Sequence, residues 1–293
     1  MNHDTLIDKR SLRQAFEQAA PTYDAAAVLQ NEVCRRMLGR LEYIKHCPAT
    51  ILDAGCGTGN ALAGLGKCYP EARLIALDLA VAMLRRARGR LPWWKGLFAH
   101  GVQAVCADIE CLPLGDASIG MVWSNLALQW LNDLPRAFAE MRRVLLPGGL
   151  LMFSTFGPDT LKELRRAYQD ADRHTHVNRF IDMHDIGDLL VNGGFGDPVM
   201  DMECFTLTYD DVRQLMRELK AIGAHNVTRG RPSGLSGRSV LTTVTRNYEA
   251  LRRDGKLPAT FEVVYGHAWK PLPRLGPTGR PVIDIKPHGG IAR

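Results

Sequence analysis

Hydrophobic and polar positions follow two different periods along most of the 293-residue chain. Short continuous apolar runs are typical of strands that are buried on both faces. Apolar residues repeated every three or four positions instead predict helices. Strands are predicted at residues 49–55, 73–79, 102–108, 118–126 and 149–157, with helices between them at 60–69, 80–91 and 134–145. Strands that alternate with helices predict an α/β fold built on a doubly wound parallel sheet.

Helical patterns lie on both sides of this core. Residues 11–44 have helical spacing interrupted at Pro21, which predicts two helices joined at the PTYD segment. After the core we expect a helix with Asp159 as its N-cap, strands that extend the sheet, and further helices that form a cap. The strands are predicted at 199–209 and 259–269, and the further helices at 180–195, 210–223 and 239–253.

These patterns divide the chain into three parts. We expect an N-terminal helical lid at residues 1–48 and an α/β domain at 49–271, with cap elements at about 158–257. The final stretch, residues 272–293, is rich in proline and glycine and has no periodicity, which predicts a disordered tail.

Composition excludes several classes of protein. Hydrophobic residues make up 46% of the chain and charged residues 23%, as in ordinary globular proteins. The seven cysteines are scattered without a CxxC pair, and neither an apolar leader nor a long apolar run is present. We therefore expect a cytoplasmic protein without a membrane partner. Its net charge of +6 favours an acidic partner weakly, and no basic stripe with interleaved aromatics indicates nucleic acid.

The segment ILDAGCGTGN, residues 51–60, carries the sharpest chemical signal. Asp53 ends a predicted strand, and Gly55, Gly57 and Gly59 follow before a helix. Glycines at these positions let the backbone turn sharply and approach a ligand closely. A carboxylate beside the loop would repel a pyrophosphate but attract the cationic head group of an amino acid. The loop therefore predicts a ligand that carries such a head group.

Acidic residues also end the next two predicted strands. Asp78 lies 19 residues after Gly59, where acids in such folds accept hydrogen bonds from ribose hydroxyls. Asp108 ends the third strand, where a carboxylate can receive the exocyclic amine of adenine. Either acid alone is often only a helix cap. Together with Asp53 they outline a nucleoside that bears an amino acid.

At this point the sequence resembles the class I S-adenosylmethionine-dependent methyltransferases. LDAGCGTG looks like their first motif, LIALDLAVAML like their second, CADIECLPL like their third, and RRVLLPGGLLMFSTF like their fifth-strand region. The resemblance covers about residues 49–157. It implies a Rossmann-like sheet of seven strands whose last strand is antiparallel, and S-adenosyl-L-methionine as the methyl donor.

The flanking segments resemble one family more closely, the malonyl-[acyl-carrier protein] O-methyltransferases of biotin synthesis. The segments of this chain that look like the family are AFEQAAPTYDAAAVLQ, SNLALQW, STFGPDTLKEL, FIDMHDIGDLL and LPATFEVVYGHAW. The resemblance then extends over about residues 11–270. The resemblance implies methylation of the free carboxylate of malonyl-acyl-carrier protein, or of malonyl-CoA. That carboxylate is ionised near neutral pH, so we expect no general base. Transfer needs no metal, and the histidines at 174, 176 and 184 have no accompanying fourth ligand.

Several polar residues are candidates for the lid and for a guide to the substrate carboxylate. We expect Tyr23 near the cofactor and the substrate, or merely packed in the helix junction, and Gln30 in polar contact with the cofactor. Arg231, with Arg238 second, is the candidate guide because a guanidinium can hold a carboxylate in a two-pronged contact. Both arginines are equally interpreted as exposed loop residues, or as contacts to the phosphopantetheine phosphate or an acidic carrier protein.

The segment VWSNLALQW, residues 122–130, ends a predicted core strand with polar side chains. In a doubly wound sheet the carboxyl end of this strand lies where ligands bind. We therefore expect Asn125 to face the methionine part of the cofactor, and Gln129 and Trp130 to border the methyl-acceptor channel. His184 is predicted either to line the substrate pocket or to cap the helix that begins near Asp185.

Two other functions stay open from the sequence. One is a methyltransferase that acts on another small carboxylate or on a quinone precursor. The other is a methyltransferase-like assembly protein, since such proteins also combine a YD-containing prefix with a methyltransferase core. The chain has no Arg-rich transit segment, which argues against mitochondrial import.

Overall fold

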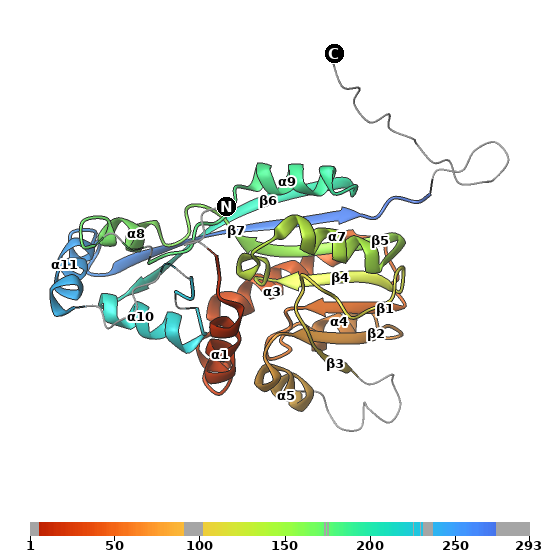
Figure 1. Cartoon of the computed structure of the whole chain (residues 1–293), viewed down its shortest axis with the longest axis horizontal. Helices are drawn as coiled ribbons and strands as arrows, with labels where there is room; N and C mark the ends of the chain where they lie inside the picture. Colours follow the sequence, from red (N-terminus) through yellow and green to blue (C-terminus); the bar gives the residue numbers. More distant parts are fainter. Residues whose placement is uncertain are drawn as a thin grey trace, which may run out of the picture.

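The computed structural model describes residues 6–90, 102–172, 174, 176–224, 226–228, 230 and 237–273. These residues form a seven-stranded sheet in the order β3-β2-β1-β4-β5-β7-β6, shown in Figure 1. The predicted fold class, a doubly wound Rossmann-like sheet, is confirmed. Its strands are β1 (Thr50–Ala54), β2 (Arg73–Asp78), β3 (Gln103–Cys106), β4 (Ile119–Asn125), β5 (Leu145–Phe156), β6 (Gly196–Tyr209) and β7 (Leu257–Trp269).

The strand order reverses beside β1, which defines where a ligand can enter. β1 pairs in parallel with β2 on one side and with β4 on the other, with Ile51 opposite both Leu74 and Met121. β2 with β3 and β4 with β5 are also parallel pairs, whereas β7 is antiparallel to both β5 and β6. In open α/β sheets, ligands bind outside the carboxyl ends of the strands at such a switch point.

Helices cover both faces of the sheet, and successive strand residues point to opposite layers. Ile51 packs in one hydrophobic cluster with side chains of α3, α4 and α5, and Leu52 packs in the other with α7 and α9. The helices are α1 (Lys9–Ala19), α2 (Tyr23–Ala26), α3 (Val28–Arg40), α4 (Leu62–Cys68), α5 (Val81–Arg90), α7 (Leu134–Val144), α8 (Lys162–Tyr168), α9 (Met183–Asn192), α10 (Val212–Ala221) and α11 (Arg238–Glu249). No helix in this part of the chain is long and apolar enough to cross a membrane.

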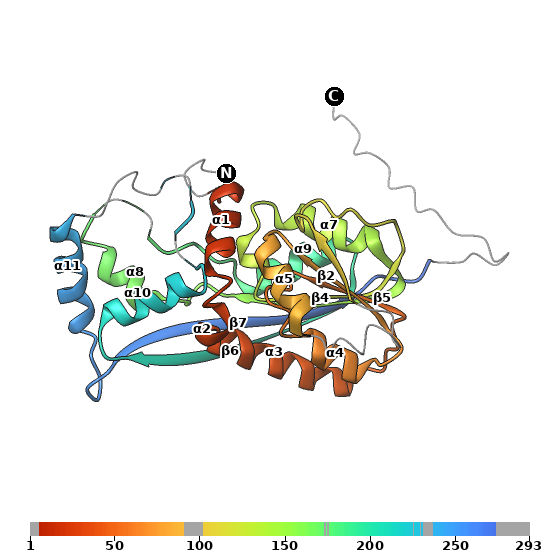
Figure 2. The same cartoon turned by 90° about the horizontal axis from the view of Figure 1, so that it is seen from below.

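Strands β6 and β7 are the longest pair, and they run beyond the rest of the sheet. On this extension α8, α10 and α11 form the cap (Figures 1 and 2). Leu164 of α8, Leu215 of α10 and Tyr248 of α11 are buried in the same cluster as the sheet residue Phe261. The Tyr248 hydroxyl donates a hydrogen bond to the Pro258 carbonyl, which fixes α11 on β7. The cap is thus continuous with the main core.

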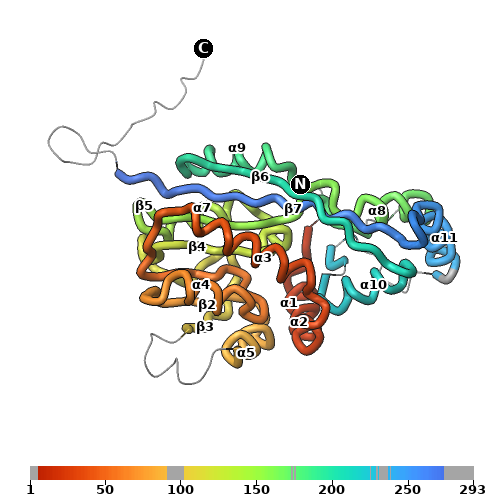
Figure 3. The backbone as a smooth tube through the Cα atoms, turned by 180° about the vertical axis from the view of Figure 1, so that it is seen from behind, coloured from red at the N-terminus to blue at the C-terminus, as the bar shows by residue number. Residues whose placement is uncertain are grey.

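The structure differs from the sequence prediction at both flanks. The described part of the prefix forms three α-helices and a short 3-10 helix (Leu41–Tyr43), because the short α2 lies between the two predicted helices. Helices α1 and α2 lie between the core and the cap, as Figure 3 shows from behind. By contrast, α3 buries Leu29, Val33 and Met37 against the sheet. The predicted tail lies outside the described residues from 274 onward.

The prediction that Asp159 is the N-cap of its helix is wrong, since α8 begins only at Lys162. The backbone N–H of Leu161 donates to the Thr260 carbonyl at 2.6 Å, and the Thr160 hydroxyl donates to the Glu262 carbonyl at 3.0 Å. These bonds to β7 hold the chain alongside the strand for several residues past β5. The helix therefore starts later than local sequence suggests.

Candidate active site

The glycine loop after β1 has the backbone conformation that glycine favours. Gly55, Gly57 and Gly59 have φ values of +80°, +53° and +80°. A Cβ atom at Gly55 would lie 2.4 Å from the Cβ of Ala127, and one at Gly59 would lie 2.8 Å from the Cβ of Ala87. Gly55 and Gly57 line a cavity, whereas the described contacts place Gly59 in the packing between the loop and α5.

Asp78 connects this loop to the following helix. Its carboxylate accepts hydrogen bonds from the backbone N–H groups of Gly57, at 2.9 Å, and Ala80, at 2.8 Å. Burial raises the pKa of Asp78 to about 6, although these two hydrogen bonds act in the opposite direction. The carboxylate lines the cavity and keeps acceptor capacity for a ligand, whereas its predicted contact with ribose hydroxyls stays a prediction.

Asp53 lies behind the wall of the cavity and is 2% exposed. Its Oδ2 atom is buried without a hydrogen-bond partner among the described residues. Burial, and then the nearby charge of Asp78, raise the pKa of Asp53 to about 8. Two buried carboxyl groups beside a glycine loop fit a cationic ligand, because a positive charge would relieve both the desolvation and the repulsion. The site is therefore suited to the amino-acid head group and sulfonium of S-adenosylmethionine.

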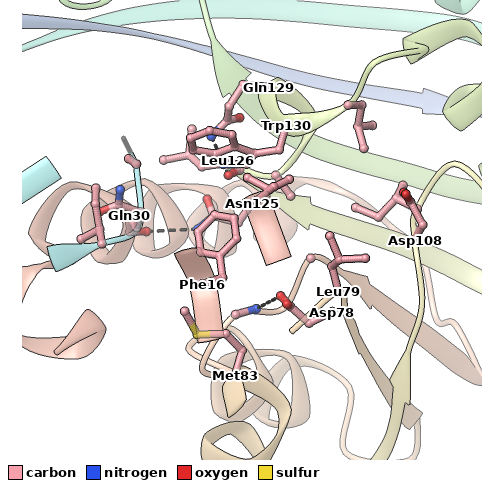
Figure 4. A pocket seen from close by; sticks show the side chains of 18 of the residues that line it. Phe16, Gln30, Asp78, Leu79, Met83, Asp108, Asn125, Leu126, Gln129 and Trp130 are labelled. Carbon is pink, nitrogen blue, oxygen red and sulfur yellow. Dashed lines mark hydrogen bonds between the residues drawn. The ribbon is translucent and has the colours of Figure 1, made fainter. Parts of the chain in front are cut away.

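The cavity lies between the lid and the carboxyl ends of β1, β2 and β4 (Figure 4). The sequence prediction missed the apolar residues that directly follow the strand-end acids, Leu79 and Ile109. They give the cavity apolar sides that suit an adenine ring. Further lining residues are Lys9, Leu12, Phe16, Met83, Ala107, Leu126, Ala127, Leu131, Phe156, Ile222 and Ala224.

Asn125 lies at the carboxyl end of β4 and lines the cavity, as predicted. Its side-chain amide donates a hydrogen bond to the backbone carbonyl of Gln30 at 3.1 Å, drawn in Figure 4. Its Oδ1 accepts a hydrogen bond from the Ser154 hydroxyl at 2.9 Å. Asn125 thus joins β5 and the start of α3, and Gln30 is also placed at the cavity. Their contacts with the cofactor remain predictions.

Asp108 also lines the cavity, but it has a partner that the sequence did not indicate. The Lys9 ammonium at the start of α1 lies 3.1 Å from Asp108 and 3.4 Å from Glu110. Lys9 lines the same cavity. The lid therefore places a positive charge beside the carboxylate that was predicted to receive the adenine amine.

Two further contacts attach the lid to the core. The Glu17 carboxylate accepts hydrogen bonds from the backbone N–H groups of Val81, at 2.7 Å, and Ala82, at 2.9 Å. These N–H groups belong to the first turn of α5, where a helix favours negative charge. Asp24 pairs with Arg90 at 2.5 Å and accepts a hydrogen bond from the Thr58 hydroxyl. These contacts hold the lid against α5 and the glycine loop.

Tyr23 lines the cavity beneath the lid, close to Gly57. Burial, followed by the charges of Asp78 and Asp24, raises the pKa of Tyr23 above its usual value. The phenol is therefore neutral at physiological pH and can donate a hydrogen bond. Its position agrees with the predicted location near the cofactor, whereas its contact with substrate remains a prediction.

A second cavity, here called the acceptor chamber, adjoins the first. Gln129 and Trp130 line both cavities, so they lie at the boundary where the sequence predicted an acceptor channel. The Gln129 side chain donates to the Leu126 carbonyl at 2.6 Å, and Trp130 packs edge-on against Phe16. The remaining lining residues are mostly apolar and were missed: Thr160, Leu161, Leu164, Tyr168, Val177, Asn178, Phe180, Met216, Leu219, Asn226 and Phe261, together with His176.

Three predicted substrate residues are not placed in this chamber. The prediction that His184 lines a pocket is wrong, because its side chain is 84% exposed and its Nδ1 lies 2.8 Å from Asp182. Asp182, not His184, caps α9. Arg231 lies outside the described residues, and Arg238 is the first residue of α11 with a side chain that is not described. In the described part, no group of three or more His, Cys, Asp or Glu residues is arranged for a metal.

The strand order, the glycine loop and the acids at the strand ends define a class I S-adenosylmethionine-dependent methyltransferase. A family model described as "Methyltransferase domain" matches residues 52–153. The YcgJ protein of Bacillus subtilis is similar in fold, with a TM-score of 0.57 over 81% of this chain and 99% of that chain, at 15% identity. S-adenosylmethionine is the methyl donor, and Asp78, Gly55 and Gly57 line the cavity at the switch point. Their contacts with the methyl donor stay predictions.

The relatives narrow this class further. The chain is 59% identical to the malonyl-[acyl-carrier protein] O-methyltransferase of Gallionella capsiferriformans, over 96% of this chain and 97% of that protein. It is 60% identical to the enzyme of the same name in Nitrosospira multiformis, over 94% of this chain and 93% of that protein. The chain belongs to the malonyl-[acyl-carrier protein] O-methyltransferase family.

Proposed function

We propose that this chain transfers the methyl group of S-adenosylmethionine to the free carboxylate of malonyl-acyl-carrier protein, in the early steps of biotin synthesis. The observation that carries this proposal is the acceptor chamber, which meets the cofactor cavity at Gln129 and Trp130. Its described lining contains no carboxylate, and its histidine, His176, is paired with Asp172 at 2.7 Å. Such a chamber suits an acceptor that is already ionised.

The reaction asks little of the protein beyond position and exclusion of water. A malonyl carboxylate has a pKa of about 4 and needs no general base near neutral pH. When bound, S-adenosylmethionine supplies a sulfonium methyl group, which the carboxylate oxygen takes while the C–S bond breaks and its electron pair stays on sulfur. The products are the methyl ester and S-adenosylhomocysteine. Trp130 and Phe156, at the boundary between the cavities, keep water from the reacting atoms.

Polar residues around this boundary support the orientation of both substrates. Asn125 and Gln30 hold the lid against the end of β4, next to the predicted position of the methionine part. Gln129 is held by the Leu126 carbonyl, so its side chain faces the boundary in a fixed position. Arg231 remains our candidate for the residue that guides the malonyl carboxylate, with Arg238 second. A partial contact suits this role, because tight pairing would weaken the nucleophile.

The names of the relatives support malonyl-acyl-carrier protein as the acceptor. The test is the purified protein with methyl-labelled S-adenosylmethionine and malonyl-acyl-carrier protein, beside malonyl-CoA, acetyl-acyl-carrier protein and free malonate. We expect a labelled methyl ester on the malonyl thioesters and none on the acetyl thioester. Absence of label from both malonyl thioesters would refute the proposal and favour another small carboxylate, a quinone precursor or a role in assembly.

A further inference from the structure

A basic groove lies on the outer surface of the cap. Its side chains come from α8 and from the segment that precedes α9, and it is lined by Lys162, Arg165, Arg166, Gln169, Asp172, His174 and Arg179 as well as three residues shared with the acceptor chamber. The shared residues are Tyr168, His176 and Val177. The basic groove therefore lies directly outside the chamber, separated from it by a thin wall.

The wall is built from two amphipathic segments. On α8, Leu164 contributes to the chamber, whereas Arg165 and Arg166 contribute to the groove. On the second segment, Phe180 lines the chamber and Arg179 lines the groove. Between them, Tyr168 and His176 stack with their ring centroids 3.8 Å apart. A chain that crosses the wall at this stack would pass from a positively charged surface into an apolar chamber.

The positive charges of the groove are only partly neutralised within the protein. Lys162 pairs with Asp159 at 2.8 Å. Arg165 donates to the carbonyls of Pro158 and Thr160, which are uncharged partners. Arg166 and Arg179 are exposed and make no ion pair with any described residue. Like charges gathered in one groove repel each other, so an anionic partner would bind there favourably.

We propose that the basic groove docks the acidic surface of the acyl carrier protein, so that its pantetheine arm enters the chamber across the Tyr168–His176 stack. This inference rests on the proposed function, because it assigns the surface that would receive the carrier of the malonyl group. Charge complementarity and the shared wall are its two independent supports. The apolar chamber would take the arm, and the groove would take the negative charges beside its attachment point.

The test compares two double charge reversals that change the net charge equally. The groove variant is Arg166→Glu with Arg179→Glu. The control variant is Lys67→Glu with Arg73→Glu, at the end of α4 and the start of β2, where both side chains are exposed and make no ion pair in the described part of the chain. Each purified protein is assayed with malonyl-acyl-carrier protein, malonyl-CoA and malonyl-pantetheine, over a range of salt concentrations.

For the groove variant, we expect the ratio of kcat/KM for malonyl-acyl-carrier protein to that for malonyl-pantetheine to fall at least about tenfold, mainly through KM. Its kcat/KM for the carrier protein should also depend less on salt, because charged surfaces steer association. The control variant should keep both the ratio and the salt dependence. Thermal unfolding and affinity for S-adenosylmethionine identify any variant that has lost its fold, and Arg166→Gln with Arg179→Gln then replaces it.

Two results would overturn the proposal. An unchanged ratio in the groove variant would mean that the carrier protein docks elsewhere. An equal loss with malonyl-CoA would mean that the groove holds a phosphate and not the surface of a carrier protein. Failure of the proposed function itself is distinct, because the unaltered chain would then methylate no malonyl thioester at all.

Discussion

The two adjoining cavities are built in contrasting ways. The walls of the cofactor cavity include backbone and charged groups in fixed contacts: the glycine loop, Asp78 bonded to two N–H groups, and the lid held by Glu17. The acceptor chamber is lined largely by apolar side chains from the cap and from the strand extension. Only a few residues, among them Gln129 and Trp130, belong to both.

This contrast separates two tasks in one molecule. Fixed hydrogen-bond partners select a cofactor that carries charge and several polar groups, because each unmet buried partner is costly. An apolar chamber adapts to a flexible arm and excludes water, but it provides little that recognises a particular acceptor. Recognition of the acceptor therefore has to come from the chamber mouth or from the outer surface. Variants in each region should consequently affect different kinetic constants.

The largest effect is expected where the cofactor loop has no room for a side chain. Gly55→Ala adds a Cβ only 2.4 Å from the Cβ of Ala127, at a residue with φ of +80°. The backbone must move, and a displacement of about 1 Å in a binding loop is enough for a loss on the order of 100-fold. We expect the affinity for S-adenosylmethionine, measured by calorimetry, to fall by about this factor.

Gly66→Ala in α4 is the matched control for this loop variant. A Cβ at Gly66 would meet only the Leu74 side chain, at 3.8 Å. Alanine is also favoured over glycine within a helix by roughly 1 kcal/mol. The control should therefore keep full affinity and gain slightly in thermal stability. If both variants bind the cofactor equally well, the tight approach of the Gly55 loop is not what shapes the cavity.

A smaller effect, on the acceptor and not on the cofactor, is expected from a variant in the acceptor chamber. Leu219→Glu places a carboxylate in an apolar wall, where it would repel the malonyl carboxylate and attract water. We expect kcat/KM for malonyl-acyl-carrier protein to fall about thirtyfold, which corresponds to a loss of about 2 kcal/mol. The affinity for S-adenosylmethionine should stay within about twofold. Leu219→Met, which conserves volume, should keep both values. An equal loss of cofactor affinity would show that the two cavities are not independent.

A variant in the lid should have a smaller effect again, and it should change only the affinity for the cofactor. Glu17→Ala removes the acceptor for the backbone N–H groups of Val81 and Ala82. Hydrogen bonds to a charged group contribute about 1.5–3 kcal/mol, so we expect S-adenosylmethionine to bind roughly tenfold more weakly. Glu71→Ala, at an exposed carboxylate just before β2, serves as the control. A lower melting temperature with unchanged cofactor affinity would mean that Glu17 only stabilises the fold.

The core strands and the glycine loop of the cofactor cavity could be predicted from the sequence. Continuous apolar runs located the core strands, and three glycines after Asp53 located the loop, because these signals are local. Lys9 and Phe16 were missed because they reach the cavity only after the chain has folded, as the 99-residue separation of Lys9 and Asp108 illustrates. Nothing in the residues around position 9 indicates that contact.

The acceptor side could not be predicted for the same reason. The chamber gathers residues from α8, the segment before α9, α10 and β7, and each of them looks locally like ordinary core. His184 illustrates the opposite error, since a polar ring near a helix start suggested a pocket, yet it points to solvent beside Asp182. Sequence patterns predict which face of a helix or strand is apolar. They do not predict whether that face packs in the core or lines a cavity.

The smallest change to the molecule is a change in the number of protons bound at the cofactor site. In the free protein, burial raises the pKa of Asp53 to about 8 and that of Asp78 to about 6, both above the unfolded value of about 3.9. A raised carboxyl pKa means that the folded state binds more protons, so the free protein should lose stability as pH rises from about 4 to 8. The cationic groups of S-adenosylmethionine favour the ionised carboxylates and should lower both pKa values again.

Binding near pH 7 should therefore release about one proton, because Asp53 is then mostly protonated in the free protein, and the affinity should rise up to about tenfold per pH unit near pH 7. Calorimetry in buffers of different ionisation enthalpy measures this release directly. Asp53→Asn removes the more strongly shifted group, so most of the release should disappear while the chamber variant Leu219→Met keeps it. Release of protons that is equal in Asp53→Asn and the unaltered chain would place the titrating group elsewhere. Since the acceptor chamber has no carboxyl group in its described lining, such a result would also weaken the separation of a charged cofactor cavity from an apolar chamber.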